Sequence, residues 1–126
     1  MASRFDVLSK GRVTTRGSMN KSEARYADEV LEFGRASGKV VQWWFEPFSL
    51  RLSSPDAGQP ARYTPDFMVL HCDGLTEIID VKTASHFDDK ASLVRIKCAA
   101  ELYPLWKFRI VRPNKKIKGG WESQEV

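Results

Sequence analysis

Cysteine is scarce in this sequence, and no long apolar run occurs in it. The two cysteines, Cys72 and Cys98, stand far apart. Two isolated cysteines exclude a disulfide framework and give poor zinc-ligand spacing, so we expect both to be reduced and to lie in the core or half-buried. No apolar run approaches the roughly 20 residues of a membrane span, and the N-terminus lacks the apolar stretch of a signal peptide. These absences predict a cytoplasmic protein with no membrane contact.

Basic residues are concentrated at the two ends of the chain, which carries a formal net charge of +4. A length of 126 residues favours one domain with a single core. We expect a basic flexible arm over residues 1–18, a folded domain over 19–112 and a basic C-terminal tail over 113–126. Basic ends around a mixed-charge core suggest a polyanionic partner, although solubilising termini would have the same composition.

The residue pattern predicts an α/β domain with the element order α-β-β-β-α-β. A capping residue, Asn20 or Ser22, precedes an amphipathic stretch that Gly38 can end. An aromatic, β-branched stretch follows, which predicts one strand or a bent pair of strands interrupted at Pro47. Asp-Gly between two apolar runs signals a hairpin. A mixed sheet flanked by helices accommodates this order, with helices over 21–37 and 87–103 and strands over 40–52, 63–71, 75–82 and 106–112.

Two acids interrupt the apolar runs of the predicted hairpin. Successive side chains of a strand alternate between faces, so Asp80 and Lys82 share one face in "TEIIDVK" and Glu77 points to the other. In the preceding strand Asp66 shares its face with Met68, and the hairpin can bring Asp66 opposite Asp80. Two neighbouring carboxylates on a half-buried sheet repel each other and lose solvation.

A bound cation would neutralise such a pair of carboxylates. Mg²⁺ prefers oxygen ligands and uses one or two protein carboxylates together with water and substrate phosphate. Lys82 beside the ion could orient a water and stabilise charge on phosphorus, which suits metal-assisted phosphodiester hydrolysis. A simpler interpretation is that Asp66 only starts a strand after Pro65, while Asp80 and Lys82 form a surface pair.

Pro65-Asp66 followed by Asp80-Val81-Lys82 resembles the signature of the PD-(D/E)xK nucleases. The resemblance extends over residues 20–112 and implies a restriction-endonuclease-like core. Within that superfamily the segment "YTPDFMVL…DVK" is most similar to small phage and prophage nucleases, among them Holliday-junction resolvases. It implies a Mg²⁺-dependent DNA endonuclease, with Mn²⁺ as a substitute, acting on branched DNA in phage recombination or DNA processing.

The resemblance also implies roles for individual residues. Asp66 and Asp80 would hold the metal and Lys82 would serve the attacking water. Glu23 stands where family members place a further acid on the first helix, which implies a role in the metal shell or in positioning the water. Glu46 in "WWFEPF" is a possible additional acid. Symmetrical cutting of a junction needs two active sites, so the resemblance implies a homodimer.

Several basic residues are candidates for contacts with the DNA backbone. Phosphate contacts come from such side chains and carry no sequence information, so we expect recognition by shape; the helix residues could equally be a solvated face. Two other functions stay open: a nuclease for linear duplexes or DNA ends, and a non-catalytic DNA-binding module. The DNA-binding candidates are Lys10, Arg12, Arg16, Lys90, Arg95, Lys97, Lys115 and Lys116.

Overall fold

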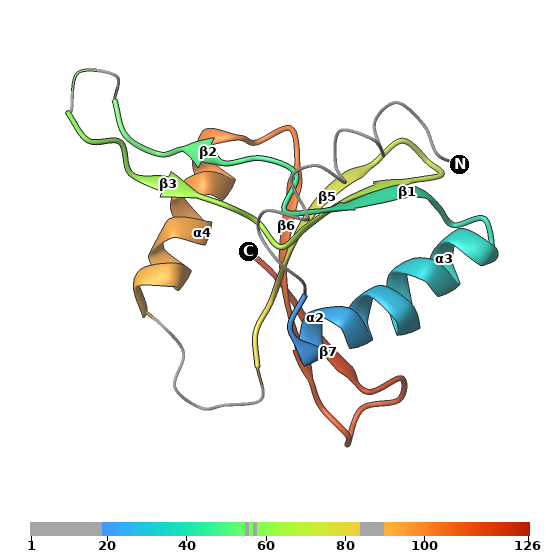
Figure 1. The fold of residues 1–126 in the computed structure, drawn as a ribbon. Coiled ribbons are helices and arrows are strands. Elements are labelled where there is room, and N and C mark those ends of the chain that lie inside the picture. The colour runs from blue at the N-terminus through green and yellow to red at the C-terminus, as the bar shows by residue number, and fades with distance from the viewer. Residues whose placement is uncertain (1–18, 55, 57, 84–89) are drawn as a thin grey trace.

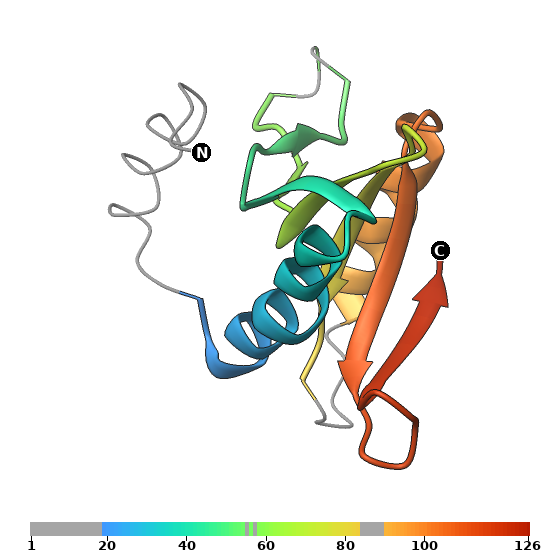
Figure 2. The same ribbon diagram turned by 90° about the vertical axis from the view of Figure 1, so that its right-hand side faces the viewer.

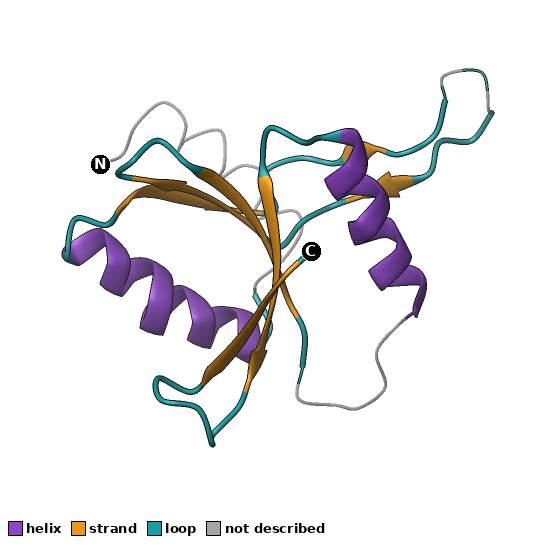
Figure 3. Cartoon of the chain, turned by 180° about the vertical axis from the view of Figure 1, so that it is seen from behind, coloured by secondary structure: helices purple, strands orange, loops and turns teal. Residues whose placement is uncertain are grey.

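The computed structural model describes residues 19–54, 56, 58–83 and 90–126. These residues form three layers, with a sheet between two helical layers (Figure 1). The N-terminal helix covers one face, and the second helix covers the other (Figure 3). The predicted α/β class and mixed sheet are therefore confirmed. Among the described residues no helix has both the length and the apolar character needed to cross a membrane.

The first helix begins at a reciprocal cap. Asn20 Oδ1 accepts the Glu23 N–H at 2.8 Å, and Glu23 Oε1 accepts the Asn20 N–H at 2.9 Å, which satisfies two of the donors left unpaired at a helix start. A π-helical middle part joins two α-helical parts, and Gly38 follows the end with φ +84°. The three parts of the first helix are α2 (Lys21–Tyr26), η1 (Ala27–Glu32) and α3 (Phe33–Ala36).

Within the described residues, five strands form one mixed sheet in the order β1-β4-β5-β6-β7. All neighbours are antiparallel except β5 and β6, which are parallel because α4 (Lys90–Leu102) connects them. The predicted hairpin is confirmed as β4–β5, with Gly74 in its turn at φ +90°. The strands are β1 (Val40–Phe45), β4 (Phe67–His71), β5 (Thr76–Val81), β6 (Lys107–Pro113) and β7 (Trp121–Glu125).

Alternation along β5 divides the core between the two faces of the sheet. Ile79 and Val81 pack toward the first helix, together with Phe67. Ile78 packs toward α4, against Ile96. Asp80 stands two residues after Ile78 in β5. Its side chain therefore lies on the same face of the sheet, toward α4, as the alternation predicts.

A two-stranded arm is inserted between β1 and β4. Its strands, β2 (Leu50–Arg51) and β3 (Arg62–Tyr63), form a separate antiparallel sheet. The arm extends from the body beside α4 (Figure 1). The stretch predicted as one strand or a bent pair over 40–52 is thus β1 and β2, which belong to different sheets.

The predicted C-terminal boundary is wrong, because residues beyond 112 belong to the sheet. β7 pairs along β6, from Arg109↔Glu125 to Pro113↔Trp121 (Figure 2). The strand is polar, so its sequence alone gives no strand signal; its place comes from pairing with β6. The arm predicted over residues 1–18 lies outside the described residues.

The expectation of buried cysteines is also wrong. Cys72 lies exposed in the β4–β5 turn, and Cys98 lies exposed on α4. Along the described part of α4 the buried residues are Ile96 and Ala99, whereas Val94 is 59% exposed. The helix therefore presents one narrow face to the sheet and the arm, and Cys98 lies outside that face.

Candidate functional site

The two predicted acids meet where β4 and β5 begin to separate. The pairing of Phe67 with Ile79 places Asp66 opposite Asp80. The Asp66 Oδ2 atom accepts the Val81 N–H at 2.8 Å, so this side chain bonds directly to the neighbouring strand. The Asp66 carbonyl accepts the Glu46 N–H at 2.7 Å. Asp66 is thus fixed at both its main chain and its side chain.

Asp80 and Lys82 form a close pair on the same face. Lys82 Nζ lies 2.9 Å from Asp80 Oδ2. The side chain of Lys82 is 17% exposed and that of Asp80 is 8% exposed. These exposures contradict the interpretation of the two residues as a surface pair. Lys82 also donates to the Ser92 hydroxyl from α4, so two of the three ammonium donors are engaged.

The environment of Asp66 favours its neutral form. Burial and the negative charge of Asp80 raise the pKa of Asp66 to about 8, while the Val81 N–H opposes the rise. Glu23 adds a negative charge and a hydrogen bond, both of which raise the pKa further. Asp80 is already paired with Lys82, so a charged Asp66 would add a second negative charge that a further cation could compensate.

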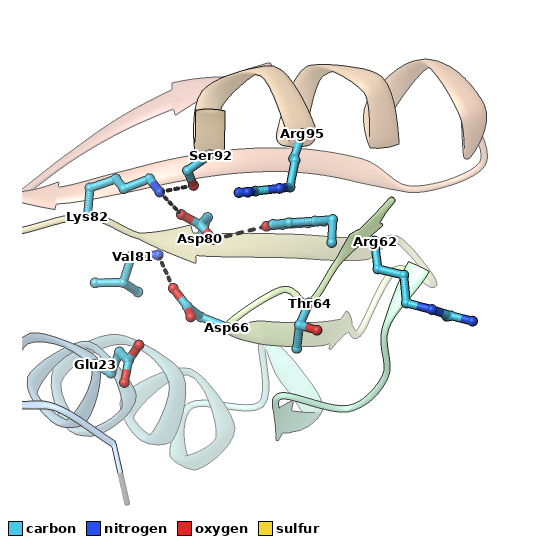
Figure 4. A pocket seen from close by; sticks show the side chains of 10 residues that line it. Glu23, Arg62, Thr64, Asp66, Asp80, Val81, Lys82, Ser92 and Arg95 are labelled. Atoms are coloured by element: carbon cyan, nitrogen blue, oxygen red, sulfur yellow. Dashed lines mark hydrogen bonds and ion pairs between the residues drawn. The ribbon is translucent and has the colours of Figure 1, made fainter. Parts of the chain in front are cut away.

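These side chains line an open cavity of about 320 Å³. Figure 4 shows Glu23 approaching from α2 on one side and Ser92 and Arg95 from α4 on the other. Arg62 lies farther along the rim, with its guanidinium directed away from the acids (Figure 4). The cavity lining consists of Glu23, Arg62, Tyr63, Thr64, Asp66, Asp80, Val81, Lys82, Ser92 and Arg95.

Glu23 and Glu46 differ in their relation to this cavity. Glu23 lines it, although its Oε1 atom also caps the helix start. Glu46 is outside the lining; it follows β1 with φ +43°, and its N–H holds the main chain of Asp66. The structure therefore brings Glu23 into the site and leaves Glu46 beside it as a main-chain support.

The basic candidates are distributed over different parts of the molecule. Arg95 lines the cavity, and Lys90 is exposed at the first turn of α4. Lys97 instead lines a separate hollow between α4 and the β6–β7 strands. Lys115 and Lys116 are exposed in the β6–β7 turn. The three N-terminal candidates, Lys10, Arg12 and Arg16, lie outside the described residues.

Tyr63, Ser92 and Arg62 escaped prediction although each belongs to the cavity. Tyr63 donates its hydroxyl to Asp80 Oδ1 at 3.0 Å. Burial, followed by the charge of Asp80, raises the pKa of Tyr63, so the phenol keeps its proton and remains a donor. Ser92 and Arg95 are three residues apart on α4, a spacing that places both on one face of a helix. This spacing from Arg95 is the sequence feature from which Ser92 could have been predicted.

The available metal ligands are two carboxylates, Asp66 directly before β4 and Asp80 in β5, with Glu23 from α2 lining the same cavity. Across the described parts of the chain, no three His, Cys, Asp or Glu side chains are grouped closely enough to hold a metal ion by themselves. A donor set of two carboxylates suits an ion that completes its coordination with water and phosphate, as Mg²⁺ does.

Comparison of the chain with protein-family models, with curated proteins and with solved structures finds no match. Its fold and site define an α/β protein in which two facing carboxylates and a half-buried lysine line an open, polar cavity.

Proposed function

We propose that the protein is a Mg²⁺-dependent DNA endonuclease of the PD-(D/E)xK type. The observation that supports this most strongly is the meeting of Asp66 and Asp80 on adjacent strands, with Lys82 bonded to Asp80. Burying two like charges destabilises a fold, whereas a divalent cation between them removes the repulsion. Burial, and then the charge of Asp80, raise the pKa of Asp66, and a bound cation would lower it again.

The residues divide the work of phosphodiester hydrolysis among them. Asp66 and Asp80 would hold the ion, and Glu23 would assist in the metal shell or by positioning the water. When bound, Mg²⁺ supplies a Lewis acid that polarises the phosphate and lowers the pKa of a coordinated water. Lys82 would orient the attacking water and stabilise the negative charge that develops on the phosphoryl oxygens. Mn²⁺ would substitute, since it accepts the same oxygen ligands.

The substrate is proposed to be DNA, and branched DNA in particular. The guanidinium of Arg95 in the cavity and the exposed ammonium of Lys90 on the same helix can contact phosphates on either side of the scissile bond. The preference for branches depends on the resemblance to phage resolvases, as does the proposed homodimer, whose two sites would cut a junction symmetrically. Such an enzyme would act in the cytoplasm, that of the host if the chain is phage-encoded.

A cleavage assay tests this proposal. Four-way, nicked and linear DNA are incubated with the protein at equal salt, in Mg²⁺, Mn²⁺ or EDTA. We expect metal-dependent cutting, fastest on the four-way junction. Equal rates on linear DNA would favour an end-processing nuclease, and binding without cutting would favour a non-catalytic module.

Two substitutions connect the activity to the site. Asp66→Ala and Asp80→Ala should abolish cutting and leave DNA affinity unchanged or improved, because a negative charge facing phosphate is removed. Asp73→Ala is the matched control, since it removes an exposed carboxylate from the β4–β5 turn. A parent-like rate in either site variant would refute the metal assignment.

A further inference from the structure

Both oxygens of Asp80 are already held by donors from two different directions. Oδ1 accepts the Tyr63 hydroxyl at 3.0 Å, and Oδ2 lies 2.9 Å from Lys82 Nζ. Each oxygen of a carboxylate has two acceptor positions, so each keeps one position beyond these contacts. The terminal torsion of an aspartate is broad and roughly two-fold; donors on both oxygens restrict it to one plane.

Tyr63 itself is rigidly placed. The residue is 5% exposed and packs in the α4-side core with Ile96 and Ala99. It belongs to β3, where it pairs with Leu50 of β2. A phenol fixed by its own packing is a better orienting group than a flexible side chain, because little conformational entropy is lost when it donates.

The arm that carries Tyr63 is anchored to α4 independently of the site. The Tyr103 hydroxyl donates to the Arg51 carbonyl at 2.9 Å. Trp106 stacks between Phe48 and Tyr103, with ring centroids at 5.4 Å and 5.8 Å. The arm that carries Tyr63 is therefore held in place by contacts outside the site as well as by those of Tyr63 itself.

We propose that Tyr63 is a positioning residue whose hydroxyl fixes the Asp80 carboxylate for metal binding and ties that ligand to the β2–β3 arm. This inference rests on the proposed function. Groups that orient a metal ligand affect affinity or activity by roughly 10- to 100-fold when they are removed. The arm is thus part of the metal site, although none of its own side chains is a ligand.

Tyr63→Phe tests the role, because it keeps the ring and removes one hydroxyl. Tyr103→Phe is the matched control: it makes the same chemical change on the same layer, at a bond that holds the arm and not Asp80. Mn²⁺ affinity is measured without DNA by electron paramagnetic resonance, and the Mg²⁺ concentration for half-maximal cutting is measured with DNA in excess. Urea unfolding at fixed pH verifies that both variants fold.

For Tyr63→Phe we expect Mn²⁺ affinity to fall about tenfold and the half-maximal Mg²⁺ concentration to rise by a similar factor. Affinity for DNA in EDTA should stay within about twofold. Tyr103→Phe should lower the unfolding midpoint and leave both metal measurements at parent values. A purely structural role for Tyr63 would give the same pattern in the two variants.

Two negative results have different meanings. If the parent binds Mn²⁺ and cuts DNA while Tyr63→Phe matches it in both metal measurements, the positioning role is refuted and the nuclease proposal stands. If the parent neither binds Mn²⁺ nor cuts any of the DNA substrates, the proposed function fails and the positioning role fails with it.

Discussion

The half-buried carboxyl of Asp66 should make the stability of the metal-free protein fall as pH rises. Its pKa is raised from 3.8 to about 8, first by burial and then by Asp80. Between these two values the folded protein keeps a proton that the unfolded chain has released. Stability therefore decreases with pH in this window, by about 1.4 kcal/mol per pH unit from this group alone.

Asp66→Asn removes this contribution. The amide oxygen can still accept the Val81 N–H, and the amide cannot ionise. The free energy of unfolding of the variant minus that of the parent should therefore increase by about 2 to 3 kcal/mol between pH 5 and pH 7. Asp28→Asn removes an exposed charge from the first helix and serves as the control.

Urea unfolding in EDTA, followed by tryptophan fluorescence at pH 5, 6 and 7 and constant ionic strength, measures the difference. Parallel stability curves for the parent and Asp66→Asn would refute the raised pKa and the electrostatic reasoning built on it. A second series at pH 7 with 10 mM Mg²⁺ tests the cation. The parent should gain stability by mass action, and Asp66→Asn should gain none.

Three further predictions concern single side chains. Lys82→Met should lower kcat by about 10²- to 10⁴-fold with DNA affinity nearly unchanged. The control Lys107→Met, which changes an exposed lysine, should cut at the parent's rate. Equal effects of the two substitutions would contradict a catalytic role for Lys82. Glu23→Gln keeps an acceptor for the Asn20 N–H, so stability should change by less than about 0.5 kcal/mol while cutting slows; an unchanged rate would leave Glu23 as a helix cap only. Gly34→Ala should destabilise the fold by about 1 to 3 kcal/mol, because the new Cβ would lie 2.6 Å from Val40 Cγ2. Adding Val40→Ala to the same chain should recover part of the lost stability, as measured by thermal unfolding.

The parts of the fold that follow from local periodicity could be predicted from the sequence. The alternation in β5 correctly placed Asp80 on one face and Glu77 on the other, where Glu77 accepts from Arg109 at 2.6 Å. The Asp-Gly turn correctly joined the two apolar runs, which in turn set Asp66 opposite Asp80. Period and turn chemistry act over a few residues, so they can be read without knowledge of the tertiary structure.

Features that depend on distant partners could not be predicted in this way. β7 is mostly exposed and lacks alternation, and the half-buried Trp121 packs on Tyr26 at 5.0 Å between ring centroids. Tyr63 reaches Asp80 because a two-residue strand in the arm is held against α4. Neither residue stands in a pattern that identifies its partner, since the contact is made across 95 residues in one case and 17 in the other.

Asp66 has a structural role and a proposed chemical role that one substitution can separate. The last backbone pair before the strands diverge is Phe67↔Ile79, and beyond it the Val81 N–H has the Asp66 side chain as its acceptor. An acid at this position thus satisfies a backbone donor that would otherwise cost about 1 to 3 kcal/mol if left unpaired and buried. Asparagine satisfies the same donor without the charge. Folding should therefore survive Asp66→Asn, and Mn²⁺ binding should be lost; if metal binding survives as well, the acid is there for the strand and not for a cation.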